Sequence, residues 1–389
     1  MARAALVALA LLIPRLARAQ VPSEPWTFYL LPYPLYNSLE GPSINLTGGW
    51  FKSAPAGPIP VGLTIEPNAS LATSGSRTFS LTWENSGRIP GWRLLAIAAY
   101  EDLERAPYFG LGNGSVVSDS LEGVYGDRHY YRYALARSSG IVAIQRRIAG
   151  PLRAAAAAQW RHYRLKPLGG APTALGADLA RGVTTDTGSF TSMEIHGALI
   201  FDTRDEEASP SGGLFVAVMV ARALKGPGDF YYTRWGADAR EFIPLASDST
   251  VVLAFRQAVA IARGRLPFCI AFERMTIWRP EDGFGGETTL RQNLPGRWLG
   301  DNNALGSVDL RYKYWDGAIG LTPIRLWLVA HADAGRVWEQ DERFSWSGLH
   351  TGYGGGAIAQ LGRASFLGVE IGYSPDAHFQ FSTTVTLGY

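Results

Sequence analysis

The side chains that could do chemistry are spread thinly along this chain. Asp202, Arg204 and Asp205 place two carboxylates beside a guanidinium, but nothing in the sequence nominates a nucleophile next to them. The sequence contains no G-x-S-x-G elbow, no phosphate-binding P-loop and no dinucleotide-binding fingerprint. The histidines lie in separate segments without the spacing of metal ligands: His129, His162, His196, His331, His350 and His378. We therefore expect no catalytic residue, no metal and no cofactor, and no enzyme activity.

The composition argues against a nucleic-acid-binding protein and against a protein with membrane-spanning helices. Lys and Arg number 36 against 34 Asp and Glu, a formal charge of +2, so no basic surface indicates a nucleic-acid partner. Hydrophobic residues make up 47% of the chain. Beyond the N-terminus, however, no apolar run reaches the roughly 18 to 20 residues of a membrane-spanning helix.

The N-terminus has the order of a secretory signal. Arg3 precedes an apolar stretch from Ala4 to Ile13, and Ala17-Arg18-Ala19 supplies small residues at the spacing that signal peptidase requires. We expect residues 1–19 to be a signal peptide that is cleaved after Ala19. The exported protein would then contain a single cysteine, Cys269, which excludes an internal disulfide framework.

In the segment 303–315, charged and apolar residues alternate, and this alternation sets the direction in which the charged side chains point. Leu310 and Tyr312 take one parity and Asp309 and Arg311 take the other, so one face of this strand is apolar and the opposite face is charged. A soluble sheet does this with one face in water. A membrane barrel does it with the apolar face outward, in lipid.

Alternating segments of this kind recur along the chain and are separated by Gly, Pro, Asn, Asp and Ser. The expected strands are 42–52, 60–72, 77–86, 91–101, 128–137, 140–149, 152–164, 193–203, 212–223, 230–242, 249–262, 303–315, 322–334, 349–360, 365–374 and 379–389. We expect a sixteen-stranded, all-β, transmembrane antiparallel barrel over residues 42–389, preceded by an irregular periplasmic lead-in at 20–41.

A soluble sandwich of two sheets remains the alternative fold, because its strands alternate in the same way, although some sixteen long strands exceed ordinary sandwich size. In the barrel, the long connections 165–192 and 263–302 would lie outside the cell. The long connection 102–127 would then lie on the periplasmic side, against the rule that periplasmic turns are short.

Several motifs resemble a known family. The motifs, in chain order, are YFGLGN (108–113), FDTRDEEASPSGG (201–213), RLPFCIAF (265–272), the GG-x-x-x-LR segment ending at Arg291, VDLRY (308–312) and HADAGRVW (331–338). Together they resemble the bacterial surface antigen family, the BamA/TamA superfamily of sixteen-stranded outer-membrane barrels. Eleven expected strands precede the 263–302 loop and five follow it, as that family's sixth surface loop requires.

The resemblance implies a latch inside the barrel. In the family this loop folds into the lumen, and its arginine meets an inner-wall motif of the form F-x-D-x-G. The equivalent residues here are Arg291, the preceding Gly285 and Gly286, and Asp333 and Gly335 of the wall. A guanidinium held by a carboxylate in a partly dehydrated channel forms strong bidentate hydrogen bonds.

This chain departs from the family pattern at three positions. Gln292 and Asn293 stand where the family has glycine and an aromatic residue after the arginine, and His331 stands where the wall motif has phenylalanine. An ordinary solvated arginine and an unpaired lumen carboxylate are the alternative interpretations of Arg291 and Asp333.

We also expect an inner-wall polar cluster, formed by Asp202, Arg204, Asp205, Asp309 and Arg311. For the first three residues, the alternative is a charged turn beside Ser209, Pro210 and Ser211. The seam between the first and last strands should involve Gly48, Gly49, Phe381 and Tyr389, since interior glycines weaken the pairing of a strand.

The resemblance implies a protein of the Gram-negative outer membrane that assists the insertion or export of proteins, or of lipids. Its partners would be the lipid bilayer, unfolded outer-membrane protein clients and a separate periplasmic protein, since the lead-in is too short for the family's periplasmic POTRA modules; we expect a monomer. A transport pore or structural barrel, and an outer-membrane lipid enzyme, are the alternative functions.

Overall fold

The computed structural model describes residues 26–37, 41–53, 58–59, 61–118, 121, 130–169, 172–225, 230–286, 288–319, 322–362 and 365–386. The expected signal peptide at 1–19 and Tyr389 therefore lie outside the described residues.

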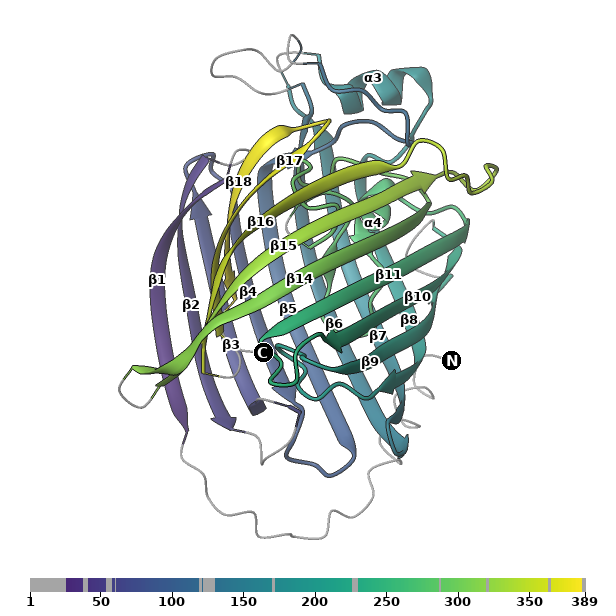
Figure 1. Cartoon of the computed structure of the whole chain (residues 1–389). Coiled ribbons are helices and arrows are strands. Elements are labelled where there is room, and N and C mark those ends of the chain that lie inside the picture. The colour runs from purple at the N-terminus through teal and green to yellow at the C-terminus, as the bar shows by residue number, and fades with distance from the viewer. Residues whose placement is uncertain are drawn as a thin grey trace, which may run out of the picture.

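These residues form a 16-stranded sheet in which every strand pairs antiparallel with its neighbour in the chain, and the sheet curls into a barrel (Figure 1). The wall strands are β1 (Thr27–Asn37), β2 (Gly41–Ser53), β3 (Val61–Ala72), β4 (Arg77–Asn85), β5 (Trp92–Pro107), β6 (Arg132–Ala149), β7 (Leu152–Pro167), β8 (Gly188–Asp202), β9 (Gly213–Ala223), β10 (Tyr232–Pro244), β11 (Val251–Gly264), β14 (Asn302–Ile319), β15 (Thr322–Trp338), β16 (His350–Leu361), β17 (Ser365–Ser374) and β18 (His378–Thr386).

Four smaller elements belong to the connections. Helix α3 (Ala174–Arg181) lies beyond one end of the barrel in Figure 1, between β7 and β8. The connection between β11 and β14 contains α4 (Phe268–Ala271) and the hairpin of β12 (Glu273–Arg274) and β13 (Glu281–Asp282). Among the residues described, no helix is long and apolar enough to cross a membrane.

The burial pattern of the wall strands is inverted relative to a soluble protein. On β14, Leu310 and Tyr312 are 45% and 48% exposed on the outer face. Asp333 on the adjacent strand is 3% exposed and faces the lumen with Asp309. Large apolar side chains on the outside and charges on the inside are what a bilayer requires of a barrel wall, and this excludes the soluble sandwich.

Two strand predictions were wrong, and the errors cancel in the count. Residues 27–37, expected to be part of an irregular lead-in, form β1 and pair with β2 along their whole length. The expected strands 128–137 and 140–149 are one strand, β6, which continues through Ser138, Ser139 and Gly140. The prolines of β1 hid the first strand, and the small polar residues of β6 imitated a turn.

The corrected strands remove the conflict over the long connection after β5. The strands β5, β7 and β11, which precede the three longest connections, now all end at one end of the barrel, the long-loop end, while short turns such as 86–91 and 150–151 lie at the short-turn end. In bacterial barrels the short turns are periplasmic and the long loops extracellular.

Candidate functional site: a loop that crosses the barrel lumen

The connection 265–301, hereafter the lumen loop, carries the arginine that the sequence singled out. The Arg291 Nε atom lies 2.9 Å from Oδ2 of Asp333 and its Nη2 atom 2.7 Å from Oδ1, so the pair is bidentate. The Arg291 backbone amide also donates to Asp333, at 2.7 Å. Three hydrogen bonds therefore hold one carboxylate whose side chain has no exposed surface.

A second carboxylate, that of Asp309, also binds Arg291. Arg291 Nη2 lies 2.6 Å from Oδ1 of Asp309 on β14, and Arg311 donates to the other oxygen of Asp309 at 3.1 Å. The β14–β15 register places Ser307 opposite Asp333 and Asp309 opposite His331, so the two aspartates are diagonal neighbours on the lumen face. Asp309 and Arg311, expected in a wall cluster with Asp202, belong to the Arg291 site instead.

Glycines let the loop approach the wall. At Gly335 an added Cβ would lie 2.7 Å from Cε1 of Phe284, a loop side chain that is 2% exposed. Gly285 and Gly286 adopt φ of 99° and 115°, which favour glycine. The expected glycines thus serve close backbone approach and turning of the loop.

The residues after Arg291 pack tightly although they differ from the family pattern. Gln292 takes φ of 70°, the left-handed conformation that a glycine would adopt freely. It is 5% exposed, and its carbonyl oxygen accepts a hydrogen bond from Ser374 Oγ at 2.7 Å. Asn293 donates to the carbonyls of Leu290 and Thr351, at 3.0 and 3.3 Å. The backbone of Gln292 and the side chain of Asn293 therefore fasten this part of the loop to β17 and β16.

The β12–β13 hairpin forms a second set of contacts that the sequence did not reveal. Glu273 accepts hydrogen bonds from Arg137 of β6 and Arg161 of β7. The Arg161 guanidinium also lies 2.9 Å from Glu194 of β8. A carboxylate from the loop thus lies between two arginines of the wall, and all of these side chains are largely buried.

Arg274 and Glu281 of the hairpin pair with another part of the wall, β10 and β11. Arg274 Nη2 lies 3.1 Å from Asp238 of β10. Glu281 accepts from Arg256 of β11 at 2.7 Å and from Arg274 at 3.0 Å. Arg274 and Glu281 therefore each pair with a wall residue of opposite charge.

The loop extends to the short-turn end of the barrel. Arg279 donates to Glu66 of β3 at 3.1 Å and to Glu84 of β4 at 2.9 Å. Glu84, which also accepts from Trp278 at 3.2 Å, lies next to the last residue of β4. The lumen loop therefore crosses the full depth of the barrel.

The turn between β8 and β9 (203–212) also lies at the short-turn end of the barrel. Glu207 is held by Arg93 Nη1 at 2.9 Å, and its amide donates to the Pro58 carbonyl at 3.0 Å. Arg204 binds both oxygens of Asp202, at 2.9 and 3.0 Å. Asp202 and Arg204 therefore bind each other where β8 runs into this turn. The exposed Asp205 accepts hydrogen bonds from the backbone amide and the hydroxyl of Ser211.

At the long-loop end, Arg297 fastens the lumen loop to two neighbouring connections. Its Nε atom donates to Asp376 at 2.7 Å and its Nη1 atom to Ser115 Oγ at 2.7 Å, while its guanidinium lies 3.7 Å from the Trp298 ring centroid. Burial lowers the pKa of Arg297, and the Asp376 carboxylate opposes that shift. An arginine in a loop gives no periodic signal, so sequence patterns could not select this residue.

The expected seam residues are only partly at the seam. Phe381 lies on β18, as predicted. Gly48 and Gly49 belong to the second strand and pair with Leu30 and Tyr29 of β1, so their assignment to the seam was wrong. An added Cβ at Gly49 would lie 2.3 Å from the Tyr29 ring. Gly49 accordingly makes room for an aromatic side chain of the true first strand.

Comparison with known proteins gives the same architecture. A family model described as the Omp85 superfamily domain matches residues 62–367. The structure of BamA from Haemophilus ducreyi lacking POTRA domains 1–3 is similar, with a TM-score of 0.59 at 13% identity over 93% of this chain and 70% of that chain.

CdiB from Escherichia coli gives a TM-score of 0.58 at 12% identity over 95% of this chain and 64% of that one. CdiB from Acinetobacter baumannii gives 0.50 at 12% identity, over 94% and 66%. The chain thus spans about two thirds of the length of the CdiB structures. No curated protein sequence matches it. With a family model that covers most of its length, a sixteen-stranded wall and an arginine-bearing loop inside the lumen, the chain belongs to the Omp85 superfamily.

Proposed function

We propose that this protein resides in the bacterial outer membrane and assists the insertion or export of other polypeptides there, without enzymatic chemistry. The observation that carries the proposal is the seam: among the described strands, β1 pairs only with β2 and β18 only with β17, so both ends of the sheet are unpaired. Exposed strand edges are templates for the addition of another strand.

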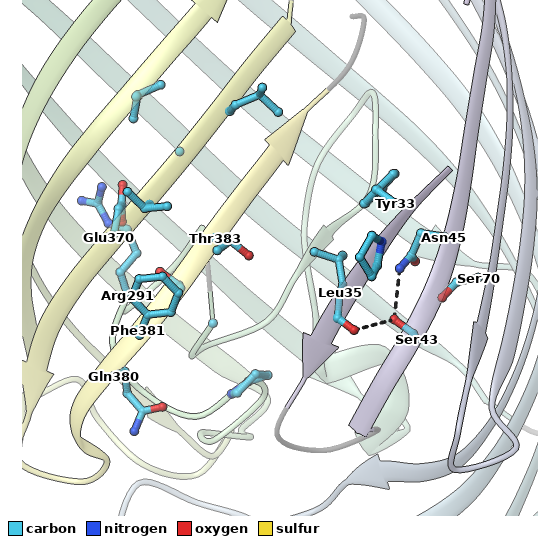
Figure 2. Close-up of a pocket in the computed structure, with 18 of the residues that line it drawn as sticks. Tyr33, Leu35, Ser43, Asn45, Ser70, Arg291, Glu370, Gln380, Phe381 and Thr383 are labelled. Atoms are coloured by element: carbon cyan, nitrogen blue, oxygen red, sulfur yellow. Dashed lines mark hydrogen bonds between the residues drawn. The ribbon is translucent and has the colours of Figure 1, made fainter. Parts of the chain in front are cut away.

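A cavity lies between the two edges. It has a volume of about 1060 Å³ and is lined by β1, β2, β17 and β18, with Arg291, Gln292 and Asn293 of the lumen loop at its inner side. Figure 2 shows Gln380, Phe381 and Thr383 of β18 on one side of this cavity and Tyr33 and Leu35 of β1 on the other. The seam therefore connects the interior of the barrel with its lipid-facing surface.

A pore of constant conductance is the alternative. The lumen loop, which pairs with wall strands from β3 to β15, opposes free diffusion through the barrel. This favours a route at the seam over a route along the barrel axis.

The test is the folding of a client. Liposomes containing this protein are mixed with a urea-unfolded, eight-stranded outer-membrane protein, and folding is followed by heat-modifiable gel migration. We expect faster folding than in empty liposomes and, in cells, less of other outer-membrane proteins after depletion. An unchanged folding rate and proteome, with steady single-channel conductance in planar bilayers, would favour the pore.

A further inference from the structure

A second cavity, hereafter the lumen cavity, lies between the wall and the lumen loop. Its volume is about 330 Å³, and it shares no lining residue with the cavity at the seam. Wall residues from β4 to β10 line one side of it, and residues 275–279 and 281 of the lumen loop line the other. Arg153, the second residue of β7, places the lumen cavity near the short-turn end of the barrel.

Most of the charges that line the lumen cavity are paired with one another. Arg240 donates to both oxygens of Asp238, at 3.0 and 3.1 Å, and Arg204 holds both oxygens of Asp202. Glu84 accepts from arginines of β5 and of the lumen loop, at 3.3 and 2.9 Å. The carboxylates of the cavity are therefore neutralised by its own arginines.

Arg153 is the exception among these arginines. Its side chain is 11% exposed, and its only hydrogen bond within the described part of the chain runs from Nη1 to Glu207, at 3.3 Å. Glu207 is already held at both oxygens by Arg93, at 2.9 and 3.0 Å. Because a guanidinium carries several N–H donors in a fixed fork, Arg153 retains donors for a further anion.

Two residues of β6 add to this basic end of the lumen cavity. Gln145 lines the cavity and is 5% exposed, yet its amide makes no hydrogen bond to any other described residue. Arg147 lies on the same face of β6, directly opposite Arg153 in the β6–β7 register. Like charges placed opposite each other in a sheet repel, so a bound anion here would relieve that repulsion.

The part of the lumen cavity next to Arg153 is apolar. The register places Ile200 of β8 opposite Arg153 and Ala217 of β9 opposite Ile200, and both apolar side chains are 2% exposed. Met275 and Ile277 of the lumen loop belong to the same hydrophobic cluster. The lumen cavity therefore combines a basic end with an adjoining apolar floor and an apolar lid.

We propose that the lumen cavity binds a small organic carboxylate with a short apolar chain. Its carboxylate accepts hydrogen bonds from Arg153 and Gln145, since a guanidinium and a carboxylate form strong bidentate pairs. Its chain lies over Ile200 and Ala217, against Ile277 of the lumen loop, where burial of apolar surface adds affinity. A volume of about 330 Å³ fits a small molecule. The ligand touches wall and loop together and so holds the loop in place.

Three ligands of graded chemistry test the lumen cavity in the whole chain. Hexanoate is titrated into the protein in a nonionic detergent and followed by calorimetry, with detergent alone as the blank. Hexanamide keeps the chain without the charge, and acetate keeps the charge without the chain. We expect hexanoate to bind with a dissociation constant on the order of 1 mM or lower and both other ligands to bind at least about tenfold more weakly.

The outcomes of this series separate the two halves of the proposed site. Hexanamide that binds as tightly as hexanoate would refute the role of the basic end. Acetate that binds as tightly would refute the role of the apolar floor. Absence of any heat from hexanoate at about 10 mM, beyond that of the blank, would overturn the proposal as a whole.

Variants place the ligand in the lumen cavity. Arg153→Gln should weaken hexanoate binding at least about tenfold, and Ala217→Leu, which fills the floor, should weaken it similarly. Arg77→Gln is the control, because Arg77 is 53% exposed and pairs with Asp102 outside this cavity, and it should bind like the parent. Heat-modifiable migration shows that each variant is folded, and the ligand series on the parent does not depend on any variant. Unchanged binding to a folded Arg153→Gln protein would contradict this assignment.

Discussion

At the scale of single residues, Arg291 and Asp333 should behave as one unit. Arg291→Ala leaves a carboxylate with no exposed side-chain surface beside Asp309, and breaking such buried pairs costs about 3–5 kcal/mol. Asp333→Asn should destabilise in the same direction. Because each change removes the ion pair between the two side chains, the double variant should lose much less stability than the sum of the two single changes, as measured by urea unfolding in detergent.

A matched control separates pairing from loss of charge. Arg77 pairs with Asp102 at 2.8 Å, but its side chain is 53% exposed. Arg77→Ala should therefore change the free energy of unfolding far less than Arg291→Ala does, because solvent screens an exposed ion pair. Additive effects of Arg291→Ala and Asp333→Asn would show that the contact does not stabilise the fold as a pair.

A carboxyl group at the long-loop end should make stability depend on pH. Burial, with repulsion from Asp301, raises the pKa of Glu339 from 4.5 to about 7. The folded state then holds this proton more tightly than the unfolded chain does. Its contribution to stability is complete below pH 4.5 and is lost as the pH rises to about 7.

Glu339→Gln should remove that dependence. We expect the variant to unfold at a temperature about 2–4 °C higher than the parent at pH 8 and at a similar temperature at pH 4.5, measured by heat-modifiable migration. A parent protein whose unfolding temperature does not fall between these pH values would contradict the raised pKa.

At the scale of elements, β1 is held to the barrel by the fit of Tyr29 against Gly49. An added Cβ at Gly49 meets three atoms of the Tyr29 side chain, at 2.3, 2.6 and 2.9 Å. Gly49→Ala should therefore displace β1 and lower stability by about 1–3 kcal/mol, the usual cost of overpacking. Adding Tyr29→Ala should restore the β1–β2 pairing, followed by hydrogen exchange of the β1 amides. If the second change brings no recovery, another contact holds β1.

At the scale of the whole molecule, the lumen loop should block ion flow. Replacing residues 273–282 with a Gly-Ser linker removes Glu273, Arg274, Arg279 and Glu281 from the lumen, and we expect a severalfold rise in single-channel conductance in planar bilayers. The same linker in place of residues 341–347, at the long-loop end, is the control and should leave conductance unchanged. Equal conductance in all three proteins would mean that the loop does not occlude the barrel.

The sequence alone predicted alternating strands, because a period of two is a local property: residues such as Leu310 and Asp309 mark two opposite faces wherever the strand lies. The inverted burial of those faces in the structure showed that the strands form a membrane barrel and not a soluble sandwich. The sequence also pointed to Arg291 and Asp333 through motif resemblance. It could not identify β1, since Pro32 and Pro34 look like loop residues until a strand is found beside them. The tertiary structure was needed to show that Glu273, Arg279 and Arg297 meet partners on strands and loops distant in the sequence. Such contacts depend on how the loop folds through the lumen, and no periodicity of the chain records that path.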